Sequence, residues 1–271
     1  MDDAWRQKCG DRTCGGDLVA DQRWVWPQAE LGGCGVQVLA DDAGITMECR
    51  EFERTGYVAM SRLIPAQLRS AVAAEALRLV EDAGVRRDLV FAATGYTPRR
   101  MRNVTRADIA REGSVIEAIY DSAMMTQLLS AVTGGPVFRC PYEPEQFVIT
   151  RLERAGDTHG WHWDDYSFAL VWVAECPPIG DGGFVECIPD TVWDKTQPEV
   201  ARLVQDRAVH KLMVGAGDVY LMRTNTTLHR VHPIRRGRRT IVNMAFASAA
   251  ELNAAVSHET MDSLWSMPGA E

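Results

Sequence analysis

The chain has 271 residues, of which 46% are hydrophobic and 24% are charged, and its formal net charge at pH 7 is −8. This length favours a single domain with one large core. The negative charge argues against a general nucleic-acid binder, because such proteins gain affinity by neutralising phosphates. No apolar run approaches the roughly 20 residues needed to cross a bilayer. The acidic N-terminus lacks the apolar core of a signal peptide, so we expect a cytoplasmic protein.

The seven cysteines do not indicate a disulfide framework, because their number is odd and no export signal precedes them. Cys9, Cys14, Cys34 and Cys49 raise the alternative of a zinc site. Their spacing is irregular and no histidine lies near them in the sequence, which argues against zinc. The other three are expected to be small core residues: Cys140, Cys176 and Cys187.

Residues 1–46 are rich in Gly, Asp and Cys without a sustained period, and we interpret them as an extension that is partly disordered or packed on the outside. Residues 47–271 form the expected domain. A short strand is predicted from Phe52 and Gly56–Met60. The segment Pro65–Val80 has apolar residues at helical spacing, and Gly84 is a suitable helix end.

The segment Arg86–Arg111 is polar and irregular, with a basic centre at Thr97–Asn103. Two interpretations stay open: a solvated loop, or a lid over the binding site, where functional residues often lie. A helix is predicted over Ser114–Val132, before the Gly-Gly-Pro sequence that begins at Gly134.

Several short strands separated by Gly and Pro follow within a β-rich core at about residues 137–247, a pattern typical of a barrel or sandwich. Residues 191–206 are expected to form a short helical insertion. The predicted strands are Gln146–Leu152, His162–Ala174, Gly183–Ile188, Ala208–Val214, Asp218–Met222, Arg230–Ile234 and Arg239–Ala247.

The sequence His-Gly-Trp-His-Trp-Asp-Asp at His159–Asp165 carries most of the chemical information. Side chains alternate along an extended backbone, so His162 and Asp164 are expected on one face. A second histidine from elsewhere would complete a two-histidine, one-carboxylate triad with open coordination positions. Such a site suits Fe(II) that binds a cosubstrate and oxygen together.

Downstream motifs make a family resemblance specific. A Gly-Gly turn begins at Gly182, a Gly-Asp strand at Gly217, and a His-x-x-x-Pro sequence at His229 is followed by Gly237–Asn243. This order resembles the Fe(II)- and 2-oxoglutarate-dependent oxygenases over about residues 52–250. The resemblance implies a mainly β fold with flanking helices, namely the double-stranded β-helix, a jelly-roll or cupin-like barrel.

The resemblance also implies roles for single residues. His162, Asp164 and His229 would bind the iron. His232, on the opposite face of the strand, is a competing ligand. Arg239 would bind 2-oxoglutarate, because a guanidinium matches a carboxylate with two hydrogen bonds. If Arg239 points inward, alternation places Asn243 inward and Arg238 outward.

A closer resemblance rests on the stretch from His159 to Tyr166. It is similar to the radical halogenases of free lysine and its analogues, and to their hydroxylating relatives. Halogenases have glycine at the position of Asp164, which makes room for chloride, so aspartate here implies hydroxylation. The resemblance places the amino acid against His159, Asp165, Glu145 and Asn243, although Ala245 replaces a threonine of some relatives. A turn that only orients His162 is the alternative for His159 and Asp165.

Three further residues are candidates for substrate binding. Arg99 or Arg100 would meet the α-carboxylate, and Trp265 would close over the substrate or cap the core. We therefore expect an enzyme that uses Fe(II), 2-oxoglutarate and O2 to hydroxylate a free basic amino acid, lysine first, releasing succinate and CO2. The alternatives are an oxygenase of another metabolite or carrier-bound residue, and a non-catalytic cupin-like binding protein. Monomer and homodimer both stay open.

Overall fold

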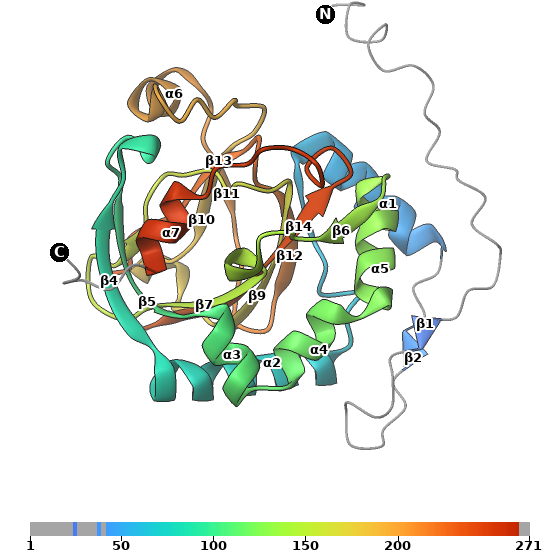
Figure 1. Ribbon diagram of the computed structural model, residues 1–271. Helices are drawn as coiled ribbons and strands as arrows, with labels where there is room; N and C mark the ends of the chain where they lie inside the picture. Colours follow the sequence, from blue (N-terminus) through green and yellow to red (C-terminus); the bar gives the residue numbers. More distant parts are fainter. Residues whose placement is uncertain (1–23, 26–36, 39–41, 266–271) are drawn as a thin grey trace, which may run out of the picture.

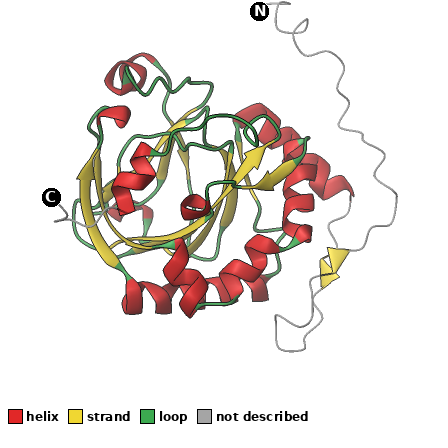
Figure 2. Cartoon of the chain, in the orientation of Figure 1, coloured by secondary structure: helices red, strands yellow, loops and turns green. Residues whose placement is uncertain are grey.

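The computed structural model describes residues 24–25, 37–38 and 42–265. Two antiparallel sheets with helices outside them make up the fold (Figures 1 and 2). The large sheet has the strand order β3-β12-β9-β14-β7-β5-β4, with β6 added to β14 and β8 to β5. The small sheet has the order β11-β10-β13. This arrangement confirms the predicted mainly β, jelly-roll-like fold class with flanking helices.

The strands of the large sheet are β3 (Tyr57–Ala59), β4 (Val85–Val90), β5 (Pro98–Val104), β6 (Val137–Arg139), β7 (Phe147–Leu152), β8 (Thr158–His159), β9 (Phe168–Glu175), β12 (Val219–Arg223) and β14 (Arg239–Ser248). Those of the small sheet are β10 (Val185–Ile188), β11 (His210–Leu212) and β13 (Leu228–Val231). A separate pair consists of β1 (Trp24–Val25) and β2 (Gln37–Val38). The α-helices are α1 (Asp42–Thr55), α2 (Ala66–Ala83), α3 (Arg106–Glu112), α4 (Val115–Asp121), α5 (Ala123–Thr133), α6 (Val200–Asp206) and α7 (Glu259–Trp265). Short 3-10 turns are η2 (Ala92–Thr94), η3 (Glu143–Glu145) and η4 (Ile179–Asp181).

The two faces of the large sheet bury different partners, as strand alternation requires. On β12, Val219 and Leu221 pack into a core shared with α1, α2, α4 and α5. Their neighbours Tyr220 and Met222 point to the other face and pack with Val185 of the small sheet. Figure 1 shows the helices α2 to α5 along one side of the large sheet, with α7 on the opposite side. The inner face is therefore free to build a site between the sheets.

The predicted strand near residue 57 and the helix that ends at Gly84 are both present as β3 and α2. Phe52 was wrongly assigned to that strand; it is fully buried in α1. Helix α1 runs across the boundary expected between residues 46 and 47. The predicted helix Ser114–Val132 is divided into α4 and α5, because Ser122 has extended dihedral angles (φ −66°, ψ 125°).

The segment Arg86–Arg111 is not a solvated loop, which corrects the first interpretation, and its role as a lid stays a prediction. It contains the hairpin of β4 and β5, followed by α3. The arginines of β5 alternate: Arg99 is buried and Arg100 is exposed. Because β5 also pairs with β7, this hairpin widens the large sheet on the side of the pocket.

The predicted strand His162–Ala174 is wrong in its first half, since β9 begins only at Phe168. His162 instead forms an isolated antiparallel bridge with His229 of β13. Strand β13 accordingly begins two residues before the predicted Arg230. The backbone of the histidine motif thus joins the two sheets: His159 pairs with β5 of the large sheet, and His162 pairs with β13 of the small one.

Some predictions concern segments for which the structure gives little. Cys9, Cys14 and Cys34 lie outside the described residues, as does most of the expected extension. Cys140 and Cys187 are buried, as expected of core residues, and Cys176 is half-buried. Within the described residues, no helix has the length and apolarity that a membrane span requires. The cytoplasmic location and the oligomeric state stay predictions.

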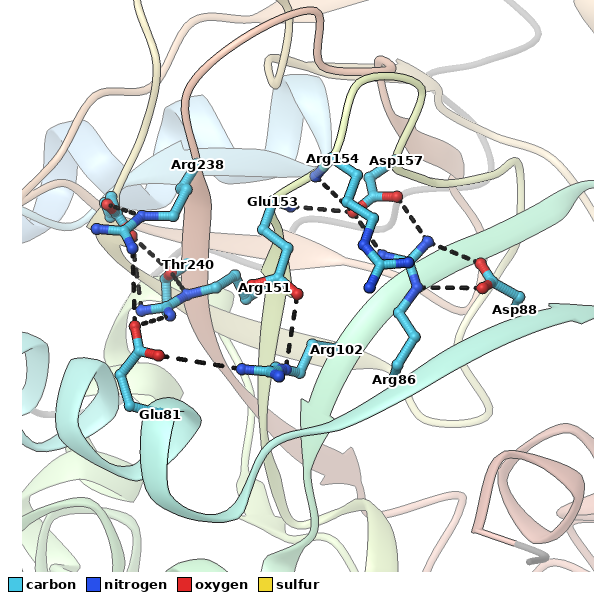
Figure 3. Close-up of polar contacts among 11 residues, drawn as sticks. Glu81, Arg86, Asp88, Arg102, Arg151, Glu153, Arg154, Asp157, Arg238 and Thr240 are labelled. Carbon is cyan, nitrogen blue, oxygen red and sulfur yellow. Dashed lines mark hydrogen bonds and ion pairs between the residues drawn. The ribbon is translucent and has the colours of Figure 1, made fainter. Parts of the chain in front are cut away.

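A polar network fixes the turn that leads from β7 to the histidine motif (Figure 3). Buried Asp157 receives hydrogen bonds from both terminal nitrogens of Arg86 on β4, each 2.7 Å long. Its Oδ2 also accepts the backbone N–H groups of Glu153 and Arg154, each at 3.0 Å. Burial alone would raise the pKa of Asp157, but these donors outweigh it and lower the pKa.

We expect Asp157→Asn to lower the free energy of unfolding by about 2 kcal/mol at neutral pH, since it weakens a buried charged hydrogen-bond set. A carboxyl with a lowered folded pKa stabilises the protein above its unfolded pKa of about 3.9 and loses this effect as the pH falls. The difference between wild type and variant should therefore shrink toward about pH 3–4. Denaturant unfolding at several pH values measures it.

The control is Asp88→Asn. Asp88 also binds Arg86, at 2.8 Å, but its side chain is 55% exposed. Exposed pairs contribute about 1 kcal/mol or less, so this variant should differ little from wild type. Equal losses in both variants would contradict the role given to Asp157.

Candidate metal centre and active-site pocket

The inner faces of the two sheets line one pocket, and α7 borders it. Its wall includes Thr260, Met261 and Leu264 of α7 together with inward residues of β5, β7, β12 and β14. Many of the polar residues predicted for the site lie on this wall: Arg99, Glu145, His159, His162, Asp164, Asp165, His229, Arg239 and Asn243.

Two histidines and one carboxylate converge at one end of the pocket. His162 Nε2 lies 3.5 Å from Asp164 Oδ1, and His229 Nε2 lies 3.9 Å from the same oxygen. Two donors that each lie about 2.1 Å from an ion can be at most about 4.2 Å apart. The three atoms therefore fit a single divalent metal, and they form one of the two possible metal-binding groups among the described residues.

The backbone presents both imidazoles with the same nitrogen toward this point. His162 and His229 exchange two backbone hydrogen bonds of 2.9 Å, so their rings lie 4.1 Å apart. His162 Nδ1 lies 2.7 Å from the Gly160 carbonyl, and His229 Nδ1 lies 2.9 Å from the Thr227 carbonyl. Each Nδ1 therefore carries the proton, which leaves Nε2 free to bind a metal.

Burial also favours the neutral form of His162 and His159. It lowers the pKa of His162 well below its usual value, and the nearby His159 and His229 add to this effect. The His159 ring stacks on His162 at 3.6 Å, and burial lowers its pKa as well. A neutral imidazole is the form that binds metal.

His232, the competing ligand, lies outside this group. Its Nδ1 is 3.1 Å from Glu186 Oε2, and its ring stacks on Phe184 at 4.4 Å. It does not line the pocket, so the structure brings His229 and not His232 to Asp164.

Arg239 is a buried cation whose hydrogen-bonding capacity is only partly used. It is 1% exposed, and its Nε and Nη2 have no hydrogen-bond partner in the described part of the chain. Tyr220 of β12 shares a hydrogen bond with it. The preceding residue, Arg238, lies on the outer face, and its Nε donates to Glu175 Oε1 at 2.9 Å. A buried guanidinium with free donors fits a carboxylate from a ligand.

The remaining substrate candidates divide into two groups. Arg99 lies in the pocket wall against the Phe91 ring at 4.8 Å, and burial lowers its pKa to about 10. Arg100 faces outward on β5, which corrects its prediction as a binding residue. Trp265 is also outside the pocket wall; it packs beside Leu264 and lies 5.9 Å from Arg87. Earlier residues of α7 take the place expected for Trp265.

The end of the pocket opposite Arg239 contains acidic groups. Ligand atoms of Glu145, Asp165 and His258 all lie within 4.8 Å of one another. Burial raises the pKa of Glu145 well above its usual value, and the carboxylates of Asp165 and Asp164 raise it further. Burial likewise raises the pKa of Asp165, while Lys195 at 2.6 Å opposes the rise.

Comparison with known proteins now identifies the family. The sequence model of a family described as Halogenase D matches residues 40–266. The chain belongs to the Halogenase D family. No curated protein matches it. This membership and the fold agree with the resemblance to 2-oxoglutarate-dependent oxygenases that the order of motifs indicates.

Solved structures share the fold of this Halogenase D family member. The non-heme alpha-ketoglutarate-dependent epimerase SnoN from nogalamycin biosynthesis is 17% identical, with 85% of this chain and 92% of that chain covered and a TM-score of 0.58. AviO1 from Streptomyces viridochromogenes Tue57 is 19% identical, with coverages of 76% and 95% and a TM-score of 0.58. A Pseudomonas putida prolyl-4-hydroxylase is 16% identical, with coverages of 75% and 98% and a TM-score of 0.50.

Sequence reasoning missed Tyr220 in the pocket wall, and it missed Lys195 and His258, which lie behind that wall beside Asp165. Tyr220 could have been found, because alternation along β12 places it inward. Lys195 and His258 carry no local signal, since their partner Asp165 is 30 and 93 residues away. Their relevance follows only from the packing of the chain.

We expect His162→Ala and His229→Ala each to weaken Fe(II) binding by at least about tenfold, because even partners behind a ligand typically cost that much. Metal content after equilibrium dialysis under anaerobic conditions measures this. His232→Ala is the matched control and should keep the wild-type metal content. Loss of metal in His232→Ala with retention in His229→Ala would contradict the proposed centre.

Proposed function

We propose that this protein is an Fe(II)- and 2-oxoglutarate-dependent oxygenase that hydroxylates a free amino acid, with lysine or a related basic amino acid as the substrate. One observation carries this proposal: a two-histidine, one-carboxylate group shares a pocket with a buried arginine that has free donors. A neighbour of the same fold supports it, since SnoN (18% identical, TM-score 0.58) was solved with Fe3+ and alpha ketoglutarate.

Each part of the pocket has a task in this reaction. His162, Asp164 and His229 hold the metal, and Arg239 with Tyr220 binds the far carboxylate of 2-oxoglutarate. Bound Fe(II), 2-oxoglutarate and O2 supply the chemistry: one oxygen atom enters a C–H bond of the substrate and the other enters succinate, with loss of CO2. The protein contributes by orienting the substrate carbon toward the metal.

Asp164 favours hydroxylation although the family is described as a halogenase family. Its Oδ1 lies within 3.9 Å of both imidazole Nε2 atoms, which is where a third protein ligand belongs. A halide on the metal needs a position that this carboxylate takes. The same geometry leaves three positions for 2-oxoglutarate and O2.

The charges along the pocket suit a basic amino acid. Arg99 is 4% exposed with an unpaired Nε among the described residues, and it would meet the α-carboxylate. Glu145 is 6% exposed and its Oε2 lacks a partner in the described chain, so it can receive an ammonium group. Asn243 offers an unpaired Oδ1 within the described structure. A buried charge without a partner is costly, so a neutral side chain would leave this end unsatisfied.

The experiment is turnover of a panel of free amino acids with Fe(II), 2-oxoglutarate and excess chloride. We expect succinate together with a product heavier by one oxygen, with lysine or ornithine turned over best. Mass spectrometry should find no chlorinated product. A dominant chlorinated product would contradict the role of Asp164. Activity on leucine and none on lysine or ornithine would contradict the basic substrate, and no succinate with any metabolite would contradict the oxygenase.

Arg239→Ala is expected to raise the KM for 2-oxoglutarate by at least about tenfold, because a charge-assisted, two-bond contact is lost. Iron binding should persist, since the three metal ligands remain. The matched control is Arg238→Ala, which removes an exposed arginine from the outer face. Near-normal KM in Arg239→Ala, or an equal rise in both variants, would refute this assignment.

A further inference from the structure

Lys195 joins three segments at the acidic end of the pocket. Its Nζ donates to Asp165 Oδ1 at 2.6 Å, on the loop that carries the metal ligands. It also donates to the Ser257 carbonyl at 2.6 Å and lies 3.3 Å from Glu259 Oε2, at the start of α7. Lys195 itself belongs to the segment between β10 and α6, and it does not line the pocket.

The surroundings of Lys195 hold its ammonium in this place. The Trp193 ring lies 4.4 Å from Nζ and stacks on Trp163 of the metal-ligand loop, with ring centroids 5.9 Å apart. Trp193 Nε1 donates to the Ala93 carbonyl at 2.7 Å, which ties the segment to η2. Asp194 Oδ1 accepts the backbone N–H of Thr196 at 2.8 Å. These contacts hold the segment around Trp193 and Lys195 in place, and the segment brings the ammonium to the acidic end from outside the pocket.

The acidic end contains two buried carboxylates, and Lys195 donates a hydrogen bond to only one of them, Asp165. The Asp165 side chain is 2% exposed and is paired with Lys195. Glu145 lies within 4.8 Å of it, and its Oε2 has no hydrogen-bond partner among the residues described. His258 Nδ1 lies 3.7 Å from the other Asp165 oxygen, Oδ2. A second cation in the pocket would thus find a free oxygen on Glu145, whereas Asp165 is already bound to Lys195.

We propose that Lys195 is a positioning residue. It binds Asp165, so that Glu145 receives the side-chain ammonium of the substrate, and this pairing fixes which substrate carbon faces the metal. The inference rests on the proposed function and deepens it. The Lys195 ammonium then balances Asp165, and the side-chain ammonium of the substrate balances Glu145. It also refines the sequence-based role of Asp165, which becomes an anchor for Lys195 beside the substrate.

The distances show why this choice affects the product. One carboxylate oxygen of Glu145 and one of Asp165 lie within 4.8 Å of each other, whereas neighbouring carbons of a substrate chain are roughly 1.5 Å apart. Without Lys195, one substrate ammonium would be drawn to both carboxylates. A shift of part of that distance brings a different carbon to the metal, and a misplacement of about 1 Å can cost on the order of a hundredfold in rate.

The test compares Lys195→Met, which removes the charge but keeps the length, with Lys195→Arg and Glu259→Gln. For Lys195→Met we expect a second hydroxylated isomer, or at least about tenfold more succinate per hydroxylated product, with an unchanged KM for 2-oxoglutarate. Lys195→Arg keeps the cation, so its ratio of succinate to hydroxylated product should be close to that of wild type. Glu259 is outside the pocket wall and its side chain is 47% exposed, so Glu259→Gln should match wild type.

A binding measurement that needs no turnover accompanies it. Calorimetry under anaerobic conditions should show that Glu145→Gln weakens lysine binding by at least about tenfold more than Asp165→Asn does. This comparison decides the matter if Lys195→Met does not fold. A folded Lys195→Met with the wild-type products and the wild-type ratio of succinate to hydroxylated product would overturn the inference alone. Equal losses of lysine affinity in Glu145→Gln and Asp165→Asn would do the same. Wild-type protein that releases no succinate with any amino acid would overturn the proposed function and this inference with it.

Discussion

The backbone bridge between His162 and His229 is the contact on which the site depends. Two hydrogen bonds of 2.9 Å join a loop before β9 to strand β13 of the other sheet. The bridge holds the imidazole rings 4.1 Å apart, and the carbonyls of Gly160 and Thr227 then fix which nitrogen faces inward. Asp164, two residues after His162, completes the group, and its backbone N–H donates to the Thr224 carbonyl at 3.4 Å. The jelly-roll arrangement is needed because it brings the two sheets together at this bridge.

The pocket is otherwise organised by charges that the fold leaves incompletely paired. Arg239 and Arg99 are buried cations with free nitrogens within the described chain, and Glu145 is a buried acid in the same condition. Unpaired buried groups are costly for stability, so their presence in one pocket points to ligands that complete them. By contrast, the buried Asp157 on the path to the histidine motif is fully engaged by Arg86 and backbone donors. Asp157 thus belongs to a satisfied polar network that supports the histidine motif, whereas Arg239, Arg99 and Glu145 have unsatisfied atoms beside the pocket.

Local pattern predicted those features that depend on neighbours in the sequence. The spacing of His162 and Asp164, and the inward direction of Arg239 with Arg238 outward, follow from positions one or two residues apart. The β4–β5 hairpin was missed because alternating arginines look like a solvated loop until Arg99 is known to face buried acids. The extent of β9 was missed because His162 pairs with a strand 67 residues later. Lys195 was missed for the same reason, since its pairing with Asp165 exists only in the folded chain.

In the proposed reaction, O2 is divided between the cosubstrate and an amino acid bound in this pocket. Turnover of lysine under isotopically heavy dioxygen, with mass spectrometry of both products, tests this division. We expect one heavy oxygen atom in succinate and one in the hydroxylated amino acid. Succinate without heavy oxygen, or a product hydroxyl group that comes only from water, would contradict it.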